Sequence, residues 1–230
     1  MSEAPTFPPL MAGEAVIADP VDAAILRAQE GCDGGLICYR VGPAESGAAL
    51  VLAPDVTLEE GAAMLPLCGV GLQNALGALA PPEVAVHLDW DGTVRVNGAR
   101  CGHLRAVAST DEVDVVPEWL VVGFSLAFRP GDDEPGHDPD RTALFAEGCG
   151  DLAPERLIEA WARHTMNWID RWEREGMAPL HAEYSGLLHG LGEPLPDGAT
   201  FLGLDERLGM LRKEDGATRL VPLVTLVETP

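Results

Sequence analysis

The chain has 230 residues and a formal net charge of −22, with 37 acidic residues against fourteen arginines and one lysine, Lys213. A field of that sign repels phosphate backbones and anionic lipid headgroups, so nucleic acid and membrane surfaces are excluded as expected partners. There is no basic N-terminal segment followed by an apolar run, and no apolar stretch reaches the ~18 residues of a membrane span. The cysteines are scattered without a C-x-x-C pair, which predicts reduced thiols in a cytoplasmic protein and no zinc site (Cys32, Cys38, Cys68, Cys101 and Cys149).

The length predicts one large domain, or one domain with a small appendage. Residues 1–18 are rich in proline and should be extended, residues 19–192 should form the main domain, and residues 193–230 should form a small β-domain. Asp19 followed by Pro20 is typical of an N-cap and a first helical turn, and Gly31 should end that helix.

Two short apolar runs, residues 35–41 and 48–53, have the length of strands, and residues 42–47 (GPAESG) should form the loop between them. Thr57 opens a capping-box pattern that predicts a helix over residues 58–79. Pro66 and Gly69 should bend this helix.

Residues 86–106 predict a β-meander, because alternating apolar and polar positions are separated by tight turns at Asp91-Gly92 and Asn97-Gly98. Residues 119–128 should form a long strand. The strongest helical pattern covers residues 154–175, where three tryptophans fall on one stripe that should pack on the sheet (Trp161, Trp168 and Trp172).

Asp151 should cap the helix over residues 154–175, and Gly176 should end it. A short helix over residues 181–188 and strands over residues 200–204, 208–212 and 219–227 should follow. Strands and helices mixed without strict alternation predict an α+β fold, with a mostly antiparallel sheet and helices on one side.

Several stretches resemble the biotin/lipoate protein ligases in order and spacing. Residues 86–106 are similar to their W-P-N-D … K-x-x-G-I-L segment, residues 119–128 to the strand that carries G-x-G-x-N, and residues 141–148 (RTALFAEG) to the segment before the last catalytic-domain helix. The resemblance implies the biotin ligase-like fold of the class II aminoacyl-tRNA synthetases, with a small C-terminal β-domain. It also implies biotin and ATP as ligands and a carrier-protein lysine as acyl acceptor.

The site motifs of that family are altered here. Residues 42–47 stand in place of the phosphate-binding G-R-G-R-x-G loop, and they contain Glu45 and no arginine. Gly102-His103-Leu104 aligns with G-I-L, which puts Ala99 or Arg100 where the catalytic lysine belongs. Arginine keeps the positive charge of lysine but not its compact ammonium group.

The remaining motifs differ as well. Gly123 matches the first glycine of G-x-G-x-N, whereas Ser125 and Ala127 replace its second glycine and its asparagine. The W-P-N-D motif has become Trp90-Asp91-Gly92-Thr93. These combined changes argue against conventional use of ATP.

The candidate catalytic residues are Arg100 and Cys101. A ligand pocket is expected between the meander and the later strand (Trp90, Gly102, His103, Leu104, Gly123 and Ser125). Cys101 is a candidate acyl-thioester nucleophile if Arg100, His103 or Arg105 lowers its pKa, although a lone strand cysteine is more often a small buried hydrophobe. Residues 101 and 103 should point to the same face.

The histidines of this pocket, His87 and His103, are more often hydrogen-bonded than catalytic. Acidic side chains between Asp132 and Asp140, together with His137, have the chemistry of metal ligands but not their spacing, which favours a solvated loop.

Three functions remain open. In the first, the chain is a ligase-fold protein without conventional ATP-dependent ligation that binds a small acyl or biotin-like ligand or a carrier protein. In the second, it is an active ligase or acyltransferase in which Arg100 or Cys101 replaces lysine. In the third, it is a non-catalytic interaction protein that self-associates as a homodimer through its sheet face. An acidic carrier domain would be repelled by the charge of this chain.

Overall fold

The structure is a computed structural model that describes residues 4–130, 138 and 140–230. Its main sheet has the strand order β1-β2-β3-β7-β6-β5-β4, with β11 pairing to β6. The pairs are antiparallel except β1 with β2 and β11 with β6. In chain order the strands are β1 (Ala12–Ala15), β2 (Leu36–Arg40), β3 (Glu45–Leu52), β4 (Val86–Leu88), β5 (Thr93–Val96), β6 (Ala99–Ala108), β7 (Leu120–Ala127) and β11 (Val227–Glu228).

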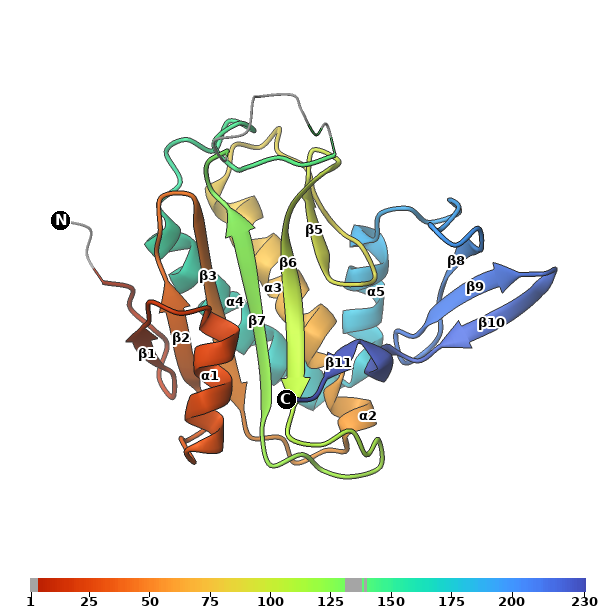
Figure 1. The fold of residues 1–230 in the computed structure, drawn as a ribbon, viewed down its shortest axis with the longest axis horizontal. Coiled ribbons are helices and arrows are strands. Elements are labelled where there is room, and N and C mark those ends of the chain that lie inside the picture. Colours follow the sequence, from red (N-terminus) through yellow and green to blue (C-terminus); the bar gives the residue numbers. More distant parts are fainter. Residues whose placement is uncertain (1–3, 131–137, 139) are drawn as a thin grey trace.

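One face of this sheet packs on three helices, α3 (Met64–Leu79), α4 (Pro154–Glu175) and α5 (Met177–Leu187), which lie behind the sheet in Figure 1. Trp161 is fully buried there, in an edge-to-face contact with Phe124 whose ring centroids lie 5.0 Å apart, and its indole N–H donates to the Cys68 carbonyl at 3.2 Å. The tryptophan stripe is therefore core, as expected.

The bounds of α4 are those predicted from its periodicity, but its cap is not. Ala153 occupies the N-cap position without a side-chain hydrogen bond, so Asp151 does not cap the helix. Gly176 ends α4 with φ of 75°, a conformation that glycine adopts without steric cost. Glu159 on α4 is buried and accepts hydrogen bonds from the backbone N–H and the hydroxyl of Thr6, which ties the N-terminal segment to this helix.

The opposite face is covered in part by α1 (Pro20–Gln29), so helices lie on both sides of the sheet and not on one. Asp19 caps α1 as expected by accepting from the N–H groups of Val21 and Asp22. Val21 packs with Val107 and Val121 in a second, smaller hydrophobic cluster. The strands farther from α1 on this face carry exposed polar side chains, including His103 on β6.

The helix expected over residues 58–79 is divided into α2 (Leu58–Gly61) and α3. The break lies at residues 62–63, before Pro66, which falls in the first turn of α3 where its missing N–H costs little. The Thr57 side chain makes no capping hydrogen bond. The N–H groups of Leu58 and Glu59 instead donate to carbonyls of the loop at Val115 and Val113.

The C-terminal residues form a separate antiparallel sheet of β8 (Thr200–Leu204), β9 (Met210–Glu214) and β10 (Ala217–Val221), which projects beside α5 in Figure 1. The strand expected over residues 208–212 begins two residues later, because Leu208 has φ of 66° in the preceding turn. The strand expected over residues 219–227 is interrupted by Pro222 and a 3-10 turn, η1 (Leu223–Leu226). The chain then returns to the main sheet as β11.

Within the described residues, one helical stretch, Leu58–Leu79, is long and apolar enough to cross a membrane. In the structure 72% of its most apolar window is buried, as in a core helix, and α3 packs on both the sheet and α4.

Candidate functional site

The predicted meander is formed by β4, β5 and β6. Asn97 and Gly98 both have positive φ, 50° and 90°, as a two-residue hairpin turn requires. The register pairs Val94 with Gly102 and Arg95 with Arg100, so Cys101 is an extra residue in a β-bulge. Bulges change the direction of neighbouring side chains. Here the bulge leaves Cys101 buried and Arg100 and His103 exposed.

A cleft of about 430 Å³, the primary cleft, lies beside this bulge. His103 stands directly opposite Ser125 of β7, and Glu45 at the start of β3 completes that side. Of the expected site residues, Arg100, Cys101, Gly102, His103 and Ser125 all line this cleft. The lining also includes three polar residues that the sequence analysis did not assign to the pocket, Glu45, Arg141 and Thr142.

Arg100 and Arg141 are held side by side by backbone contacts. The N–H of Arg100 donates to the Asp140 carbonyl at 2.8 Å, and the N–H of Thr142 donates to the Arg100 carbonyl at 2.9 Å. The two guanidinium groups therefore rise from neighbouring, fixed backbone positions at the edge of one cleft. Guanidinium is the side chain best suited to bind carboxylate or phosphate in a fixed geometry.

Cys101 has the environment of a core residue. Burial, with smaller contributions from the nearby Cys149 and Glu147, raises the pKa of its thiol to about 12. Its sulfur lies 3.5 Å from the Ala127 carbonyl. Because of the bulge, Cys101 packs in the core cluster while His103 is exposed. The expectation that the two side chains point to the same face is therefore wrong.

Three of the expected pocket residues lie elsewhere. Leu104 is buried in the main core. Gly123 lies beneath α1, where an added Cβ would meet Val21 at 2.7 Å. Trp90 is buried toward the small sheet, and its indole N–H donates to the Leu208 carbonyl at 2.8 Å.

The connection between β2 and β3 is shorter than the six-residue loop expected, because Glu45 to Gly47 belong to β3. Ser46 closes the turn by accepting from the Gly42 N–H at 3.0 Å and donating to the Gly42 carbonyl at 3.1 Å. Glu45 forms an ion pair with Arg40. This connection presents a carboxylate to the primary cleft and offers no arginine-bearing loop.

A second cleft of about 620 Å³, the junction cleft, lies between the meander and the small sheet. It shares Thr93 and Arg100 with the primary cleft, so the two meet at the β5–β6 hairpin. The sequence did not indicate this cleft, because its walls come from the meander, from residues 189–197 and from β8 and β9.

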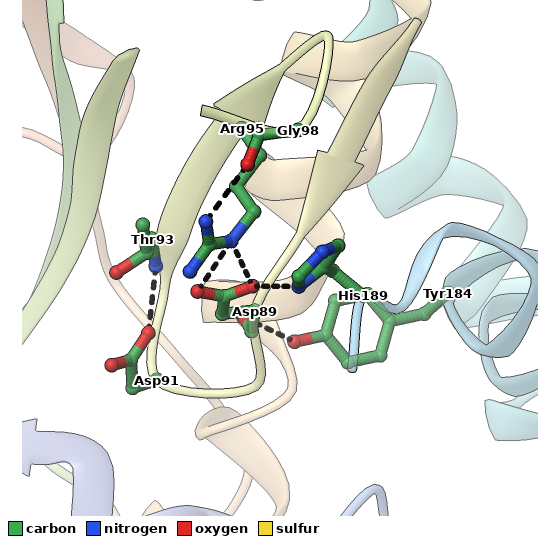
Figure 2. A network of polar contacts seen from close by, with 7 residues as sticks. All are labelled: Asp89, Asp91, Thr93, Arg95, Gly98, Tyr184 and His189. Atoms are coloured by element: carbon green, nitrogen blue, oxygen red, sulfur yellow. Dashed lines mark hydrogen bonds and ion pairs between the residues drawn. The ribbon is translucent and has the colours of Figure 1, made fainter. Parts of the chain in front are cut away.

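Asp89 fixes one wall of the junction cleft through the contacts drawn in Figure 2. Its carboxylate accepts from Nε of Arg95 at 2.7 and 2.9 Å and lies 3.2 Å from Nδ1 of His189. Arg95 also donates to the Gly98 carbonyl, and the phenol of Tyr184 reaches the Asp89 carbonyl at 3.5 Å. The hydrogen bond to Asp89 raises the pKa of Arg95, and this wall is held by charge-assisted contacts.

The acidic loop considered as a metal site lies largely outside the described residues. Asp132, Asp133, Glu134 and His137 all fall in that part of the chain. Within residues 4–130, 138 and 140–230, no three His, Cys, Asp or Glu side chains gather in a metal-binding arrangement.

Comparison with known proteins places this geometry in context. The sequence profile of the biotin/lipoate A/B protein ligase family matches residues 7–186. A biotin protein ligase-like protein of unknown function from Silicibacter sp. TM1040 is 54% identical in sequence, with a TM-score of 0.91 over 97% of this chain and 99% of its own.

Two enzymes share the fold at low sequence identity. Biotin protein ligase from Aquifex aeolicus in complex with biotin and ATP is 16% identical, with a TM-score of 0.65 over 86% of this chain and 90% of its own. The ligase from Leishmania major in complex with biotin is 14% identical, with a TM-score of 0.58 over 93% and 98%. No curated protein matches the chain.

Proposed function

The chain belongs to the biotin/lipoate A/B protein ligase family, and on that premise we propose that it binds a small acyl or biotin-like carboxylate in the primary cleft without conventional ATP-dependent ligation. The observation that carries this proposal is the position of its only lysine. Lys213 is exposed on β9 of the small sheet, and Arg100 stands at the primary cleft instead. The ligases use a cleft lysine to stabilise the negative charge of the adenylate, a form of electrostatic catalysis.

The electrostatics of the primary cleft support a ligand with a single negative charge. Glu45 and Asp138 line it together with Arg100 and Arg141, so its carboxylates offset much of the positive charge. A triphosphate carries several negative charges and needs a dense set of donors, such as the N–H groups of a glycine-rich loop. The closed turn at Gly42 to Ser46 does not offer that loop.

A carboxylate fits the groups that are present. Arg100 and Arg141 supply fixed donors, and the hydroxyl of Ser125 stands beside His103 on the floor of the cleft. Charge-assisted hydrogen bonds of this kind are roughly twice as strong as neutral ones.

The burial of Cys101 weakens the acyltransferase alternative, because a thiol with a raised pKa is a poor nucleophile at neutral pH. All five cysteines are free in the structure, which supports the proposal of a cytoplasmic protein. The strong acidity of the chain argues against docking of an acidic carrier domain.

A thermal-shift screen of the full chain with biotin, lipoate, octanoate and nucleotides tests this proposal. A ligand that binds the native state raises stability by about 2.7 kcal/mol at a hundredfold excess over its dissociation constant. We expect one of the carboxylates to raise Tm and the nucleotides to leave it unchanged. The shift should be lost in Arg100→Gln and retained in Arg163→Gln, a matched variant of an exposed α4 arginine.

Two results would count against the carboxylate site. One is a Tm shift with ATP that exceeds the shift with every carboxylate. The other is a carboxylate shift that is equal in the native chain and in Arg100→Gln.

A further inference from the structure

The primary cleft suits the carboxylate of the proposed ligand but offers little surface for its apolar body. Apart from Cys101, Gly102 and Ala127, every residue that lines it has a polar or charged side chain. The Cys101 side chain is itself buried in the core. An acyl chain or a ring gains affinity by covering apolar protein surface, because both surfaces are then removed from water. The primary cleft alone would leave that part of the ligand against polar groups.

The junction cleft supplies the apolar surface that the primary cleft lacks. Its apolar lining consists of Trp90 from the meander, Phe201 and Met210 from the small sheet, and residues 194–196 (PLP) from the loop after α5. The first three are more than nine-tenths buried, so only part of each side chain faces the cleft, whereas the two prolines are exposed. Pockets for small organic ligands are lined mainly by such apolar and aromatic side chains.

The charged groups of the junction cleft do not select a ligand of either sign. Arg95 and Arg212 form ion pairs with aspartates of the same cleft. Among the residues that the structure describes, the charged lining groups without an ion-pair partner are of both signs, Arg100 on one side and Asp91 and Glu193 on the other. The feature that distinguishes this cleft is therefore its apolar surface, which suits an uncharged part of a ligand.

The two clefts are continuous at Arg100. Both are lined by Arg100 and by Thr93, which lie on the neighbouring strands β6 and β5. The Arg100 side chain is exposed, and its backbone N–H is held by the Asp140 carbonyl at 2.8 Å. A carboxylate bound to Arg100 therefore lies at the boundary of the junction cleft, and a chain attached to that carboxylate can extend directly into it.

The junction cleft is held in shape before any ligand enters. His189 connects to the meander twice, through its ring to Asp89 and through its N–H to the Leu88 carbonyl at 2.9 Å. The Trp90 indole joins the meander to the small sheet at Leu208. A preformed cleft binds with a smaller loss of conformational entropy.

From the polar lining of the primary cleft, the apolar lining of the junction cleft and the arginine that they share, we propose that the junction cleft binds the apolar body of the carboxylate ligand. The ligand class is then a monocarboxylate with an uncharged chain or ring. Its carboxylate lies on Arg100 and its body lies between the meander and the small sheet, so the C-terminal sheet takes part in ligand selection. This inference rests on the proposed carboxylate site and extends it.

Calorimetric titration of the full chain with butanoate, hexanoate and octanoate tests the inference. The three probes have the same charge and differ only in length. Complete burial of one methylene group strengthens binding about fourfold, and burial in an open cleft should achieve part of this. We expect octanoate to bind at least about tenfold more tightly than butanoate.

Matched leucine variants locate the chain of the ligand. Leu195→Ala removes apolar surface from the junction cleft, so it should reduce the ratio of octanoate to butanoate affinity at least about threefold and leave butanoate binding unchanged. Leu202→Ala is the control, because Leu202 is exposed on β8 of the same small sheet and lines neither cleft. It should leave the ratio unchanged.

Because Leu195 is partly buried, NMR provides a second measurement that needs no variant. The indole N–H resonance of Trp90 should shift on titration with octanoate and stay in place with butanoate. The resonance of Trp172, which lines another cleft of about 550 Å³, should stay in place with both and so controls for unspecific binding of the chain.

The inference and the proposed function fail in different ways. Equal affinities for butanoate and octanoate would overturn the inference and leave the carboxylate site standing. The same holds for a ratio that Leu195→Ala does not reduce together with a Trp90 resonance that octanoate does not shift. Octanoate binding that is unchanged in Arg100→Gln, or no binding of any of the three acids up to about 10 mM, would overturn both.

Discussion

The burial and reactivity of Cys101 depend on one extra residue in β6. The bulge in β6 places its thiol in the core, and burial raises its pKa to about 12. At neutral pH almost all of the thiol is therefore protonated, whereas a nucleophile requires the thiolate. Arg100, one residue earlier, is exposed at the meeting point of two clefts. Of the two candidate residues, Arg100 has the position from which a ligand can be bound.

We expect native-state alkylation to leave Cys101 unmodified. In the folded chain at pH 7.5, iodoacetamide should react first with Cys32, which is only partly buried, and Cys101 should stay intact. In denaturant all five cysteines should react, which provides the control. Peptide mass spectrometry measures both, and alkylation of Cys101 as fast as Cys32 in the native chain would show that its thiol is reactive.

Among the elements, α3 and α4 are in close contact at Gly71. A Cβ added to Gly71 would lie 2.5 Å from the Thr165 hydroxyl and 3.1 Å from the Thr165 backbone nitrogen. These contacts are too short to be relieved by moving one flexible side chain. The separation of the helices behind the sheet, and so the position of the tryptophan stripe, depends on a glycine at this point.

Gly71→Ala should lower the free energy of unfolding by about 1–3 kcal/mol, the usual cost of overpacking a core. Gly77→Ala on the same helix is the matched control, because an added Cβ there would meet only the end of Gln73 at 3.9 Å. The control should be neutral or stabilising by up to about 1 kcal/mol, since alanine favours helices over glycine. Urea unfolding measures both variants, and equal effects would contradict the close approach.

The sequence predicted those elements whose signals are local. The tryptophan periodicity gave the full extent of α4, and Asn97-Gly98 gave the turn between β5 and β6. Features that depend on partner segments were not predictable. The bulge at Cys101 is defined by the register with β5. Arg141 pairs with Arg100 through a backbone bridge, although the two residues are about forty positions apart in the sequence. The two-residue strand β11 carries too little pattern to be recognised.

At the scale of the whole molecule, buried thiols couple stability to alkaline pH. Burial raises the pKa of Cys38 to about 11 and that of Cys101 to about 12, and it raises the pKa of Cys68 and of Tyr184 as well. In the unfolded chain a thiol titrates near pH 8.5. Above that pH the unfolded state loses protons that the native state retains, so the native state loses relative stability.

The free energy of unfolding should therefore be constant near pH 7 to 8 and fall from about pH 9 upward. Each buried thiol should contribute a decrease of about 1.4 kcal/mol per pH unit until its native pKa is reached. Urea unfolding at pH 8, 9.5 and 10.5 measures this decrease, and Cys68→Ala should make it shallower. A free energy of unfolding that does not change over this range would show that these thiols are accessible to solvent.

The central claim is that a member of the biotin/lipoate ligase family retains the fold without conventional ATP-dependent activation of a carboxylate. The most direct test is pyrophosphate release by the purified chain with Mg²⁺, ATP and biotin, lipoate or octanoate in turn. An authentic biotin protein ligase serves as the positive control. We predict release no greater than in the absence of the carboxylate. Pyrophosphate release that requires both ATP and one of these acids would contradict the claim.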